Sequence, residues 1–419
     1  MKYWKAFGFH HLASCQSTVN LGHKNAREEA MAALLALACV FFSHIVLVDG
    51  TWKECTVTGA ELSCIDSFPN FLVSKRVTKL SVWVNDKNMK NVPSNAFENF
   101  THVQEIHMYG AGFREIDPAA FKGLEALVEL DLERNKLGPT LKNNTFMHLG
   151  NLRKLNLGWN QISVISVHAF IGLHELRDLE LSHNSLRMIS RGTFSTLSKL
   201  KQLHMAGNSL VQLQDRVFEG LQGLNTLNLI HNHLSSASLA TNVFAGVNPN
   251  LWGLMLDRNK ITQFPAHVFA PISGLQVLSL SSNGLVALPS PWPGALESLY
   301  GLSFFNNSIS RIPAGLFRGL NLTQVYGGGN RYHCDCALVW YWSWLNNVTT
   351  PGELSSYRCF GPPRLKKKRF VDLSESSFSS GDSCDQSTTK SYACELFNQV
   401  NLIMVMLLAF LATATTTTT

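Results

Sequence analysis

The sequence contains little charge and little proline for its length. Only 15% of its 419 residues are Asp, Glu, Lys or Arg, 14 are proline, and the mean hydropathy is close to zero. A disordered chain would be more polar, a collagen-like chain far richer in proline, and a protein with many membrane spans more apolar. The net charge of +6 is too small to indicate a nucleic-acid partner, and we expect none. A chain with a globular core remains.

Motifs of catalysis are also missing. The sequence has no G-x-S-x-G elbow and no phosphate-binding loop, and His174-Glu175 is not followed by the second histidine of a zinc protease. We therefore expect no enzymatic activity, no cofactor and no metal ion. A catalytic site assembled on a concave surface stays an open alternative.

A repeat fills the middle of the chain. The pattern L-x-x-L-x-L-x-x-N-x-L recurs about every 24 residues, in units that begin at Val77, Val103, Leu127, Leu152, Leu176, Leu200, Leu224, Leu251, Leu275, Leu299 and Leu322. This is the pattern of a leucine-rich repeat. It predicts an α/β solenoid of the horseshoe type, with a parallel β-sheet on the concave face and disulfide-bonded caps at both ends.

Each position of the unit has an expected structural task. Positions 1, 4 and 6 should point into the core, and the alternate positions should point outward. An asparagine at position 9 should bond backbone groups of neighbouring turns; it is present as Asn135, Asn160, Asn184, Asn208, Asn232, Asn259, Asn283, Asn307 and Asn330. Ala111 takes its place in the second unit, so the ladder should be irregular at its start.

A phenylalanine follows about 18 residues into most units. We expect these rings to stack as a spine on the convex side, through Phe97, Phe121, Phe146, Phe170, Phe194, Phe218, Phe244, Phe269 and Phe317. The unit that begins at Leu275 offers Trp292 instead. The Leu, Asn and Phe residues of the pattern are structural in this interpretation.

The N-terminal end resembles a secretory signal peptide. Met31–Val48 is apolar and follows Arg27, and small or tolerated residues allow cleavage before Thr51. A polar stretch of 30 residues precedes this run. Either Met31 starts the chain, or the run is an uncleaved signal anchor with a short cytoplasmic tail.

The C-terminal end predicts membrane attachment. Val400–Ala414 is mostly apolar and no Lys or Arg follows it, while small residues and a polar spacer precede it. This is the composition of a glycosylphosphatidylinositol attachment signal, with Ser387 as the expected site and Ser383 and Ser391 as alternatives. A single short transmembrane helix is the alternative, and either one places the protein at the cell surface, on the extracellular side of the plasma membrane.

Six cysteines would remain in the mature chain. Cys55 and Cys64 flank a short segment that could form a hairpin, and we expect them to pair. Cys334, Cys336, Cys359 and Cys384 follow the last unit, where the VWYWSWL stretch predicts a helix that covers the end of the core. Zinc binding by Cys334 and Cys336 is an alternative, although their spacing matches no usual tetrahedral site.

The predicted division of the chain follows from these features. It comprises residues 1–50 (an extension plus signal peptide, with its core at Met31–Gly50), 51–76 (N-terminal cap), 77–333 (about eleven repeats), 334–384 (C-terminal cap), 385–399 (spacer) and 400–419 (hydrophobic tail). Glycosylation sequons stand at Asn99, Asn143, Asn306, Asn321 and Asn347. The basic run Arg364–Arg369 is either a solvated loop of the cap or a contact for heparan sulfate or anionic lipid.

Together these features resemble an extracellular leucine-rich-repeat receptor with cysteine-rich caps. The arrangement is similar to that of the variable lymphocyte receptors and, second, to that of the Nogo receptors. The resemblance implies the disulfides Cys334–Cys359 and Cys336–Cys384. It also implies a role for the C-terminal cap in recognition, which makes the loop from Thr349 to Tyr357 a second candidate contact.

The outward positions of the strands form the expected binding surface. Exposed aromatic and arginine side chains are typical anchors of protein interfaces. We predict ligand contacts at Trp83, Tyr109, Asp131, Arg134, Asn156, Trp159, Asp178, Glu180, His204, Asn228, Arg258, Phe305 and Tyr326. The third to fifth units, with Trp159 at their centre, are the preferred region.

The predicted function is recognition of a protein or carbohydrate ligand at the cell surface, of an immune type directed at antigens or microbes. An adhesion or neuronal-type receptor for an endogenous protein, or a secreted matrix protein, is the alternative. Since no cytoplasmic signalling domain follows the tail, transmission of a signal would require a co-receptor.

Overall fold

The computed structural model describes residues 46–48, 51–53, 55–58, 60–65, 77–83, 90–239, 242–265, 267–288 and 296–379. The chain divides into two compact units. The first reaches Ser209 and includes Val217–Leu224, and the second comprises Leu210–Arg216 and the chain from Asn225 onward. Each unit is described by itself below.

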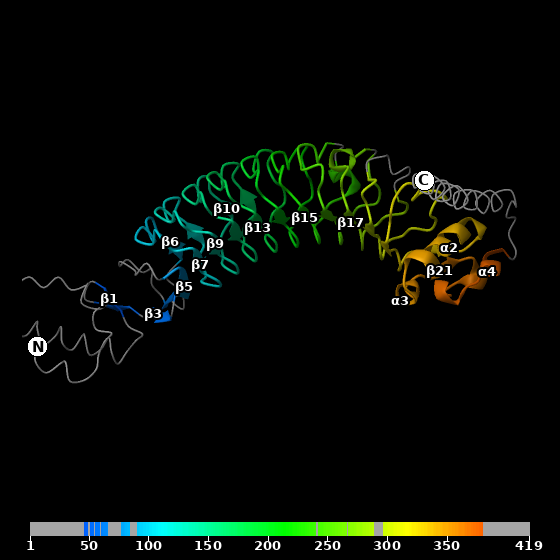
Figure 1. Cartoon of the computed structure of the whole chain (residues 1–419), viewed down its shortest axis with the longest axis horizontal. Coiled ribbons are helices and arrows are strands. Elements are labelled where there is room, and N and C mark those ends of the chain that lie inside the picture. Colours follow the sequence, from blue (N-terminus) through cyan, green and yellow to red (C-terminus); the bar gives the residue numbers. More distant parts are fainter. Residues whose placement is uncertain are drawn as a thin grey trace, which may run out of the picture. The chain divides into compact units, whose positions relative to one another are not determined.

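The first unit contains a mostly parallel sheet (Figure 1). Strands β3 (Cys55–Thr58) and β4 (Glu61–Ile65) form an antiparallel hairpin, and β4 then pairs in parallel with β5 (Lys79–Trp83). Parallel pairing continues through β7 (Glu105–His107), β9 (Glu129–Asp131), β11 (Lys154–Asn156), β13 (Asp178–Glu180) and β14 (Gln202–His204). Short strands pair separately: β1 (Val46–Val48) with β2 (Thr51–Lys53), β6 (Asn91–Val92) with β8 (Glu115–Ile116), and β10 (Thr140–Leu141) with β12 (Val164–Ile165).

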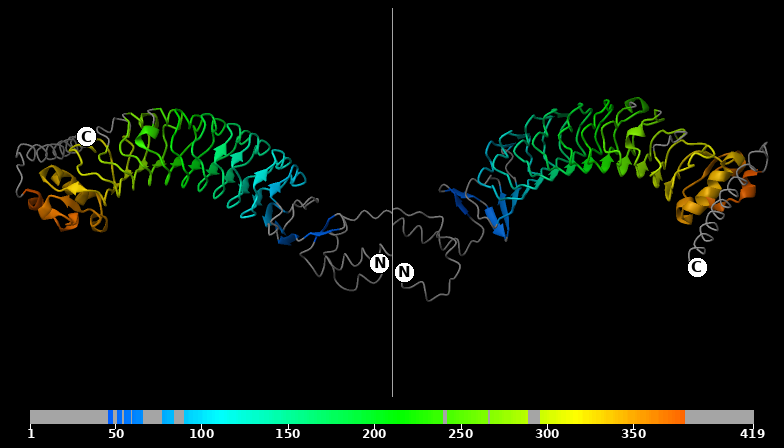
Figure 2. Two further views of the ribbon diagram at one scale, coloured as in Figure 1. Left: turned by 180° about the vertical axis from the view of Figure 1, so that it is seen from behind. Right: turned by 45° about the horizontal axis from the view of Figure 1, so that its top comes forward.

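The second unit repeats this arrangement. Its parallel strands are β15 (Thr226–Asn228), β16 (Gly253–Met255), β17 (Val277–Ser279), β18 (Gly301–Ser303) and β19 (Gln324–Tyr326). Short 3-10 turns, η4 (Ser236–Ser238) and η5 (Ala270–Ile272), lie in its connecting segments. Figure 2 shows that the strands of each unit line up along one face, with the connecting segments on the other.

The repeat accounts for the core. In the unit that begins at Leu176, the side chains of Leu176, Leu179 and Leu181 are buried, whereas Asp178 and Glu180 are only half-buried. The same alternation holds along most other strands, because successive side chains of a strand point to opposite faces; Ser81, Gly253 and Gly301 are small outward residues that are buried as well. Eleven strands, one in each predicted unit, therefore confirm the leucine-rich-repeat solenoid.

The phenylalanine spine is also confirmed. In the first unit the rings from Phe97 to Phe218 stack at centroid distances of 5.9 to 6.3 Å, and in the second unit Phe244 stacks on Phe269 at 6.4 Å. Phe317 instead packs on Trp344 of the C-terminal cap, 5.0 Å between centroids. The predicted substitute Trp292 lies outside the described residues.

The asparagine ladder links each turn to the one before it. Asn160 Oδ1 accepts the N–H of Leu137 at 3.0 Å, and its Nδ2 donates to the carbonyls of Leu132 and Leu157 at 3.0 and 3.1 Å. Asn135 reaches back to the second unit of the repeat, which has Ala111 in place of the asparagine. The ladder therefore satisfies buried backbone groups where each strand ends.

Aromatic side chains build the C-terminal cap. It contains β20 (Tyr332–His333), η6 (Cys336–Leu338), α2 (Val339–Val348), α3 (Pro351–Leu354), β21 (Cys359–Gly361), η7 (Pro363–Leu365), η8 (Phe370–Asp372) and α4 (Glu375–Ser379). The predicted helix is α2, which buries Tyr341 and Leu345. β20 pairs with β21, so the cap's small sheet begins just before the predicted boundary at residue 334.

The cysteines have structural roles in the described part of the chain. Cys334 and Cys359 form a disulfide with their Cα atoms 5.6 Å apart, and Cys64 and Cys336 are also disulfide-bonded. The zinc alternative for Cys334 and Cys336 is therefore wrong. Cys55 lies opposite Cys64 in the β3–β4 hairpin. The side chain of Cys55 and all of Cys384 lie outside the described residues, so their pairings stay predictions.

Close approach of the cap explains the three consecutive glycines of the last repeat, Gly327, Gly328 and Gly329. A Cβ atom on Gly328 would lie 2.0 Å from Ser356 Oγ, and the N–H of Gly327 donates to the hydroxyl of Tyr357 at 2.7 Å. The cap thus binds directly to the backbone of the last turn.

Within the part of the chain that the structure describes, no helix is both long enough and apolar enough to cross a membrane. The signal-peptide core before Val46, the spacer, the hydrophobic tail and Ser387 lie outside the described residues.

Candidate functional site

The residue before each ladder asparagine has a left-handed backbone. The φ angles of Arg134, Trp159 and His183 are 55°, 53° and 56°. Each of these residues donates its N–H to the following repeat, at 3.0, 2.9 and 2.8 Å. This conformation costs about 1 to 2 kcal/mol for a residue other than glycine. It places three large side chains at equivalent positions of neighbouring turns.

These side chains form a continuous row, which we call the aromatic–cation stack (Tyr109, Arg134, Trp159 and His183). The guanidinium carbon of Arg134 lies 5.7 Å from the ring centroid of Tyr109 and 5.3 Å from that of Trp159. The rings of Trp159 and His183 are stacked, 3.9 Å between centroids and 17° between planes. Trp159 is nevertheless 50% exposed. The row therefore fixes a large aromatic side chain in a position that solvent or a partner reaches.

Gly207 occupies the equivalent position of the next repeat, and its lack of a side chain leaves space for the ring of His183. Gly207 has φ of 63°, and a Cβ atom there would lie 2.6 Å from His183 Nδ1. Gly110, at the other end of the row, has the same φ but nothing within 4 Å of a Cβ atom. The two glycines thus differ only in what an added methyl group would meet.

This difference gives a matched pair of variants. Gly207→Ala and Gly110→Ala should each lose about 1 kcal/mol of unfolding free energy from the left-handed backbone. Only Gly207→Ala should also displace His183 from Trp159, which a change in the ring-proton shifts of His183 in histidine-labelled NMR spectra will report. Unchanged His183 shifts in Gly207→Ala would contradict the stacked geometry.

The outward polar side chains of the strands next to the stack accept hydrogen bonds from backbone N–H groups two residues later in the chain. Asp131 and Asn156 accept the N–H groups of Glu133 and Gly158 at 2.9 and 3.0 Å, and Glu180 accepts that of Ser182 at 2.6 Å. Asn156 also donates to Glu133 Oε2 at 3.0 Å. The sequence predicted these residues only as ligand contacts, but they also close the turn after each strand.

A histidine–carboxylate group lies beside Asp131. Nδ1 of His107 is 3.8 Å from Asp131 Oδ2, and its Nε2 is 3.6 Å from Glu105 Oε2. The contact with Asp131 raises the pKa of His107 against the opposing effect of burial. Protonation therefore strengthens this pair, and its stabilising effect is present at acidic pH and is lost as the pH rises through the raised pKa.

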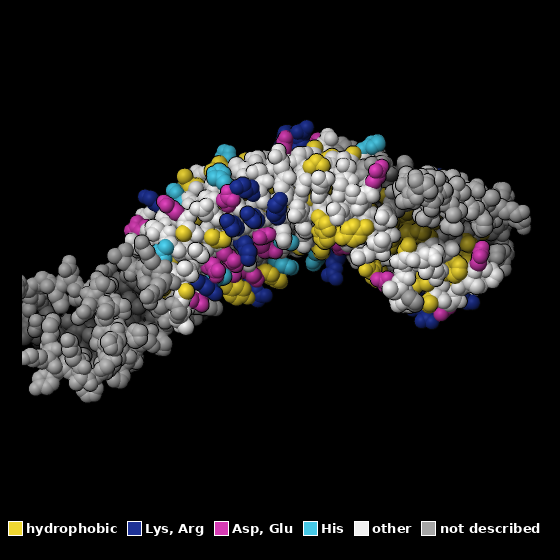
Figure 3. Space-filling model, in the orientation of Figure 1, with side chains coloured by type: hydrophobic (Ala, Val, Ile, Leu, Met, Phe, Trp, Pro, Cys, Tyr) yellow, Lys and Arg dark blue, Asp and Glu magenta, His cyan; other side chains and the backbone are white. Residues whose placement is uncertain are grey.

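A basic row borders the other end of the same strands. Arg153, Arg177 and Lys201 are exposed and adjacent, since the N–H of Arg177 donates to the carbonyl of Arg153 and that of Lys201 to the carbonyl of Arg177. Figure 3 shows Lys and Arg side chains beside Asp and Glu side chains over these repeats. This face of the first unit thus presents both signs of charge beside exposed aromatic rings.

The predicted contacts divide between the two units. Those of the first unit gather around the stack, with Asp178 and His204 half-buried on adjacent strands; Trp83 lies on β5, but its side chain is outside the described set. Arg258, Phe305 and Tyr326 of the second unit are exposed, and half-buried Asn228 accepts the N–H of Ile230 at 3.0 Å. His183 and Glu133, which complete the stack and its support, were missing from the predicted set. The signal for His183 was its place directly before a ladder asparagine.

Other predicted sites have plain structural descriptions. The sequon residues Asn143, Asn306, Asn321 and Asn347 are exposed, and Asn99 is half-buried. The second candidate contact, from Thr349 to Tyr357, is wrong at Tyr357. That side chain is buried, and burial raises its pKa to about 12.

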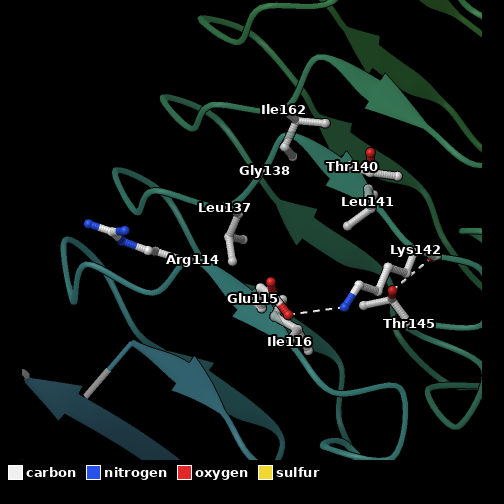
Figure 4. A pocket seen from close by; sticks show the side chains of 10 residues that line it. All are labelled: Arg114, Glu115, Ile116, Leu137, Gly138, Thr140, Leu141, Lys142, Thr145 and Ile162. Carbon is white, nitrogen blue, oxygen red and sulfur yellow. Dashed lines mark hydrogen bonds and ion pairs between the residues drawn. The ribbon is translucent and has the colours of Figure 1, made fainter. Parts of the chain in front are cut away.

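A pocket of the first unit lies outside the main sheet. Leu137, Leu141 and Ile162 line it, and Lys142 Nζ approaches Glu115 Oε2 at 3.0 Å across its wall (Figure 4). Two of its three charged lining residues thus pair with each other, and the third is Arg114. Among the described residues, no group of three or more His, Cys, Asp or Glu side chains is placed to hold a metal ion.

Comparisons with known proteins agree with this architecture. The leucine-rich-repeat family model matches residues 101–162, 139–186, 151–210 and 175–234, so this part of the chain consists of leucine-rich repeats. Toll-like receptor 5 of Homo sapiens is 28% identical over 181 residues, which are 42% of this chain and 20% of that protein. Leucine-rich repeat-containing protein 3B of Homo sapiens is 34% identical over 86 residues, 20% of this chain and 33% of that protein. The chain therefore spans a third or less of these relatives.

A solved structure extends the similarity in fold. One chain of an octameric complex of Latrophilin 3, Unc5D and the leucine-rich-repeat protein FLRT2 matches with a TM-score of 0.63 and 22% identity. The match covers 76% of this chain and 97% of that one. The class is thus a leucine-rich-repeat solenoid, with relatives among receptor-type proteins of the same class.

Proposed function

We propose that the protein is a cell-surface receptor that recognises a protein ligand through the sheet face of its first unit, centred on the aromatic–cation stack. The observation that carries the proposal is the geometry of Trp159, which is 50% exposed yet fixed by His183 and Arg134. Tryptophan and arginine are the side chains that most often dominate binding energy. A ring that is already ordered loses little conformational entropy when it is covered.

A protein ligand is favoured over a carbohydrate at this position. Arg134 and His183 come from the repeats on either side of Trp159, and both lie over its ring. A sugar that stacked on the ring would have to displace one of them. A protein surface can instead cover the row from its exposed edge and pair with the charges beside it.

Immune-type recognition is the finer role that we propose, and the similarity to Toll-like receptor 5 supports it. The similarity to the complex that contains FLRT2 favours an adhesion receptor as the alternative. Sequences from different individuals separate the two roles. Diversity concentrated at outward strand positions fits immune recognition, and uniformity there contradicts it.

The binding surface itself is tested on cells that display the full chain. A panel of purified extracellular domains is applied, and each ligand that binds is measured against Trp159→Ala. We expect that variant to weaken binding by about 2 kcal/mol, roughly thirtyfold in Kd. The matched control is Trp252→Ala, which removes a tryptophan that is 41% exposed in the second unit and should change Kd less than about threefold.

The opposite ranking of the two variants would refute the proposed surface. Treatment of the same cells with phosphatidylinositol-specific phospholipase C addresses the predicted anchor at Ser387, because a lipid-anchored protein is released and a transmembrane one is retained.

A further inference from the structure

The outer face of the C-terminal cap carries a second exposed aromatic ring. Strand β21 pairs with β20 and also with the segment Lys367–Arg369. In the second pairing the N–H of Cys359 donates to the carbonyl of Lys368 at 2.9 Å, and the N–H of Lys367 donates to the carbonyl of Cys359 at 2.7 Å. Tyr332 and Cys359 point into the cap and are buried. Their neighbours along the strands therefore point outward, since side chains alternate.

Phe360 stands on this outer face between two cations. Its ring is 57% exposed, with the guanidinium carbon of Arg331 at 5.8 Å and Nζ of Lys366 at 5.7 Å from the centroid. These cations come from different segments of the cap. Cation–π attraction to the ring thus keeps the side chains of Arg331 and Lys366 near each other although both are long and flexible.

Further cations lie on the same three segments of the cap. Arg358 donates to the carbonyl of Lys367 at 3.3 Å and, after Arg369, contributes to the lowered pKa of Asp372. We name the group the cap cation face (Arg331, Arg358, Phe360, Lys366, Lys367 and Lys368). In the part of the chain that the structure describes, none of its five cations has a carboxylate within 4.0 Å. The remaining two arginines nearby are engaged, because Arg369 binds Asp372 at 2.7 Å and Arg364 donates to the carbonyl of Ser377 at 2.6 Å. Five like charges on three adjoining segments, two of them over one ring, repel each other, and a bound polyanion would relieve that repulsion.

We propose that the cap cation face binds a sulfated polysaccharide. The cations over Phe360 argue against a lipid surface, because the ring could enter a bilayer only if it carried Arg331 and Lys366 toward the hydrocarbon. A linear chain of sulfate groups can instead contact cations from all three segments without desolvating the ring. The choice of a sulfated polysaccharide over other polyanions rests on the proposed location at the cell surface.

In this arrangement Phe360 is a positioning residue, and the lysines and arginines make the contacts. The site is separate from the aromatic–cation stack, which belongs to the first unit of the chain. If Trp159 proves not to bind a ligand, the proposed polysaccharide site is unaffected. If the cap does not bind heparin, the proposed protein-binding surface is likewise unaffected.

Heparin is the probe for this site, and the full-length protein is used. The triple variant Lys366→Ala, Lys367→Ala and Lys368→Ala should bind immobilised heparin at least about tenfold more weakly near physiological salt, with a salt dependence of log K shallower by about 2 to 3. The matched control is Lys122→Ala, Lys136→Ala and Arg187→Ala, which removes three exposed cations from the first unit that lie outside both proposed sites. The control should change Kd less than about threefold.

Two further measurements test the role of the Phe360 ring and the need for sulfate groups on the ligand. Phe360→Ala should weaken heparin binding about threefold through lost positioning, and Phe360→Tyr should restore it. Heparin stripped of its sulfates should bind weakly. The inference is overturned if the wild-type protein does not bind heparin, if the control triple loses binding and the cap triple does not, or if desulfated heparin binds equally. Binding to phosphatidylserine vesicles that the cap triple abolishes, without heparin binding, would assign the face to lipid instead.

Discussion

Phe170→Ala should lower the free energy of unfolding by about 4 kcal/mol, the largest stability effect that we expect from a single substitution. Phe170 is fully buried and stacks between Phe146 at 6.3 Å and Phe194 at 6.0 Å. Its removal leaves a cavity that three turns of the solenoid share. Since each turn contacts chiefly its neighbours, the spine cannot close the gap by a local shift. Urea denaturation followed by far-ultraviolet circular dichroism measures the loss.

Two controls separate the cavity from the loss of an aromatic residue. Phe170→Leu fills most of the space and should cost only about 1 to 1.5 kcal/mol. Phe305→Ala removes a ring that is 43% exposed and should cost less than about 1 kcal/mol. An equal loss for Phe170→Ala and Phe305→Ala would contradict the role of the spine.

Asn160→Ala should cost about 3 kcal/mol, the second largest effect. The side chain of Asn160 accepts the N–H of Leu137 and donates to the carbonyls of Leu132 and Leu157, all in the buried ladder. Without it, the buried N–H of Leu137 loses its acceptor, and a buried unsatisfied group costs about 1 to 3 kcal/mol. The carbonyls of Leu132 and Leu157 each lose one of two donors and keep the bond from Asn135 or Asn184, so the estimate lies at the upper end of that range. The same denaturation experiment measures the effect.

Asn160→Asp keeps the volume of the side chain but removes its donor. It should destabilise nearly as much as alanine, because two carbonyl oxygens would then face a carboxyl group. The control Asn151→Ala breaks only an exposed hydrogen bond to the carbonyl of Glu125 and should stay within about 0.5 kcal/mol of the parent. A harmless Asn160→Asp would show that the ladder stabilises by packing and not by its hydrogen bonds.

The solenoid could be predicted from the sequence because its rules are local and repeated. The apolar residue at position 4, a leucine in all units except those with Ile106 and Val325, is buried in each unit, and the asparagine at position 9 meets equivalent backbone groups in the turns that have it. Eleven copies of one pattern leave little freedom for another fold.

The candidate site was predictable only in part. Trp159 and Arg134 could be identified as exposed anchors, because their types and positions are visible in the sequence. Their contact with each other could not, since it depends on the left-handed backbone before the ladder asparagine. The pairing of His183 with Trp159 depends in addition on the absence of a side chain at Gly207, one turn later.

The caps depended on contacts that no repeat pattern contains. Tyr357 lies in a loop of the sequence yet is buried, because its hydroxyl bonds the backbone of Gly327, 30 residues away. The exposed position of Phe360 likewise follows from the pairing of β20 with β21 and not from its neighbours in the sequence.

At the left-handed position before each ladder asparagine, the side chain lies on the surface while the backbone N–H makes the hydrogen bond that supports the solenoid. The backbone N–H of that residue bonds the next turn whatever its side chain is, and glycine, arginine, tryptophan, histidine, serine and asparagine all occupy the position in this one chain. The solenoid therefore behaves as a scaffold with an exchangeable row of side chains. A library randomised at Arg134, Trp159 and His183 would be a set of proteins with one framework and many specificities.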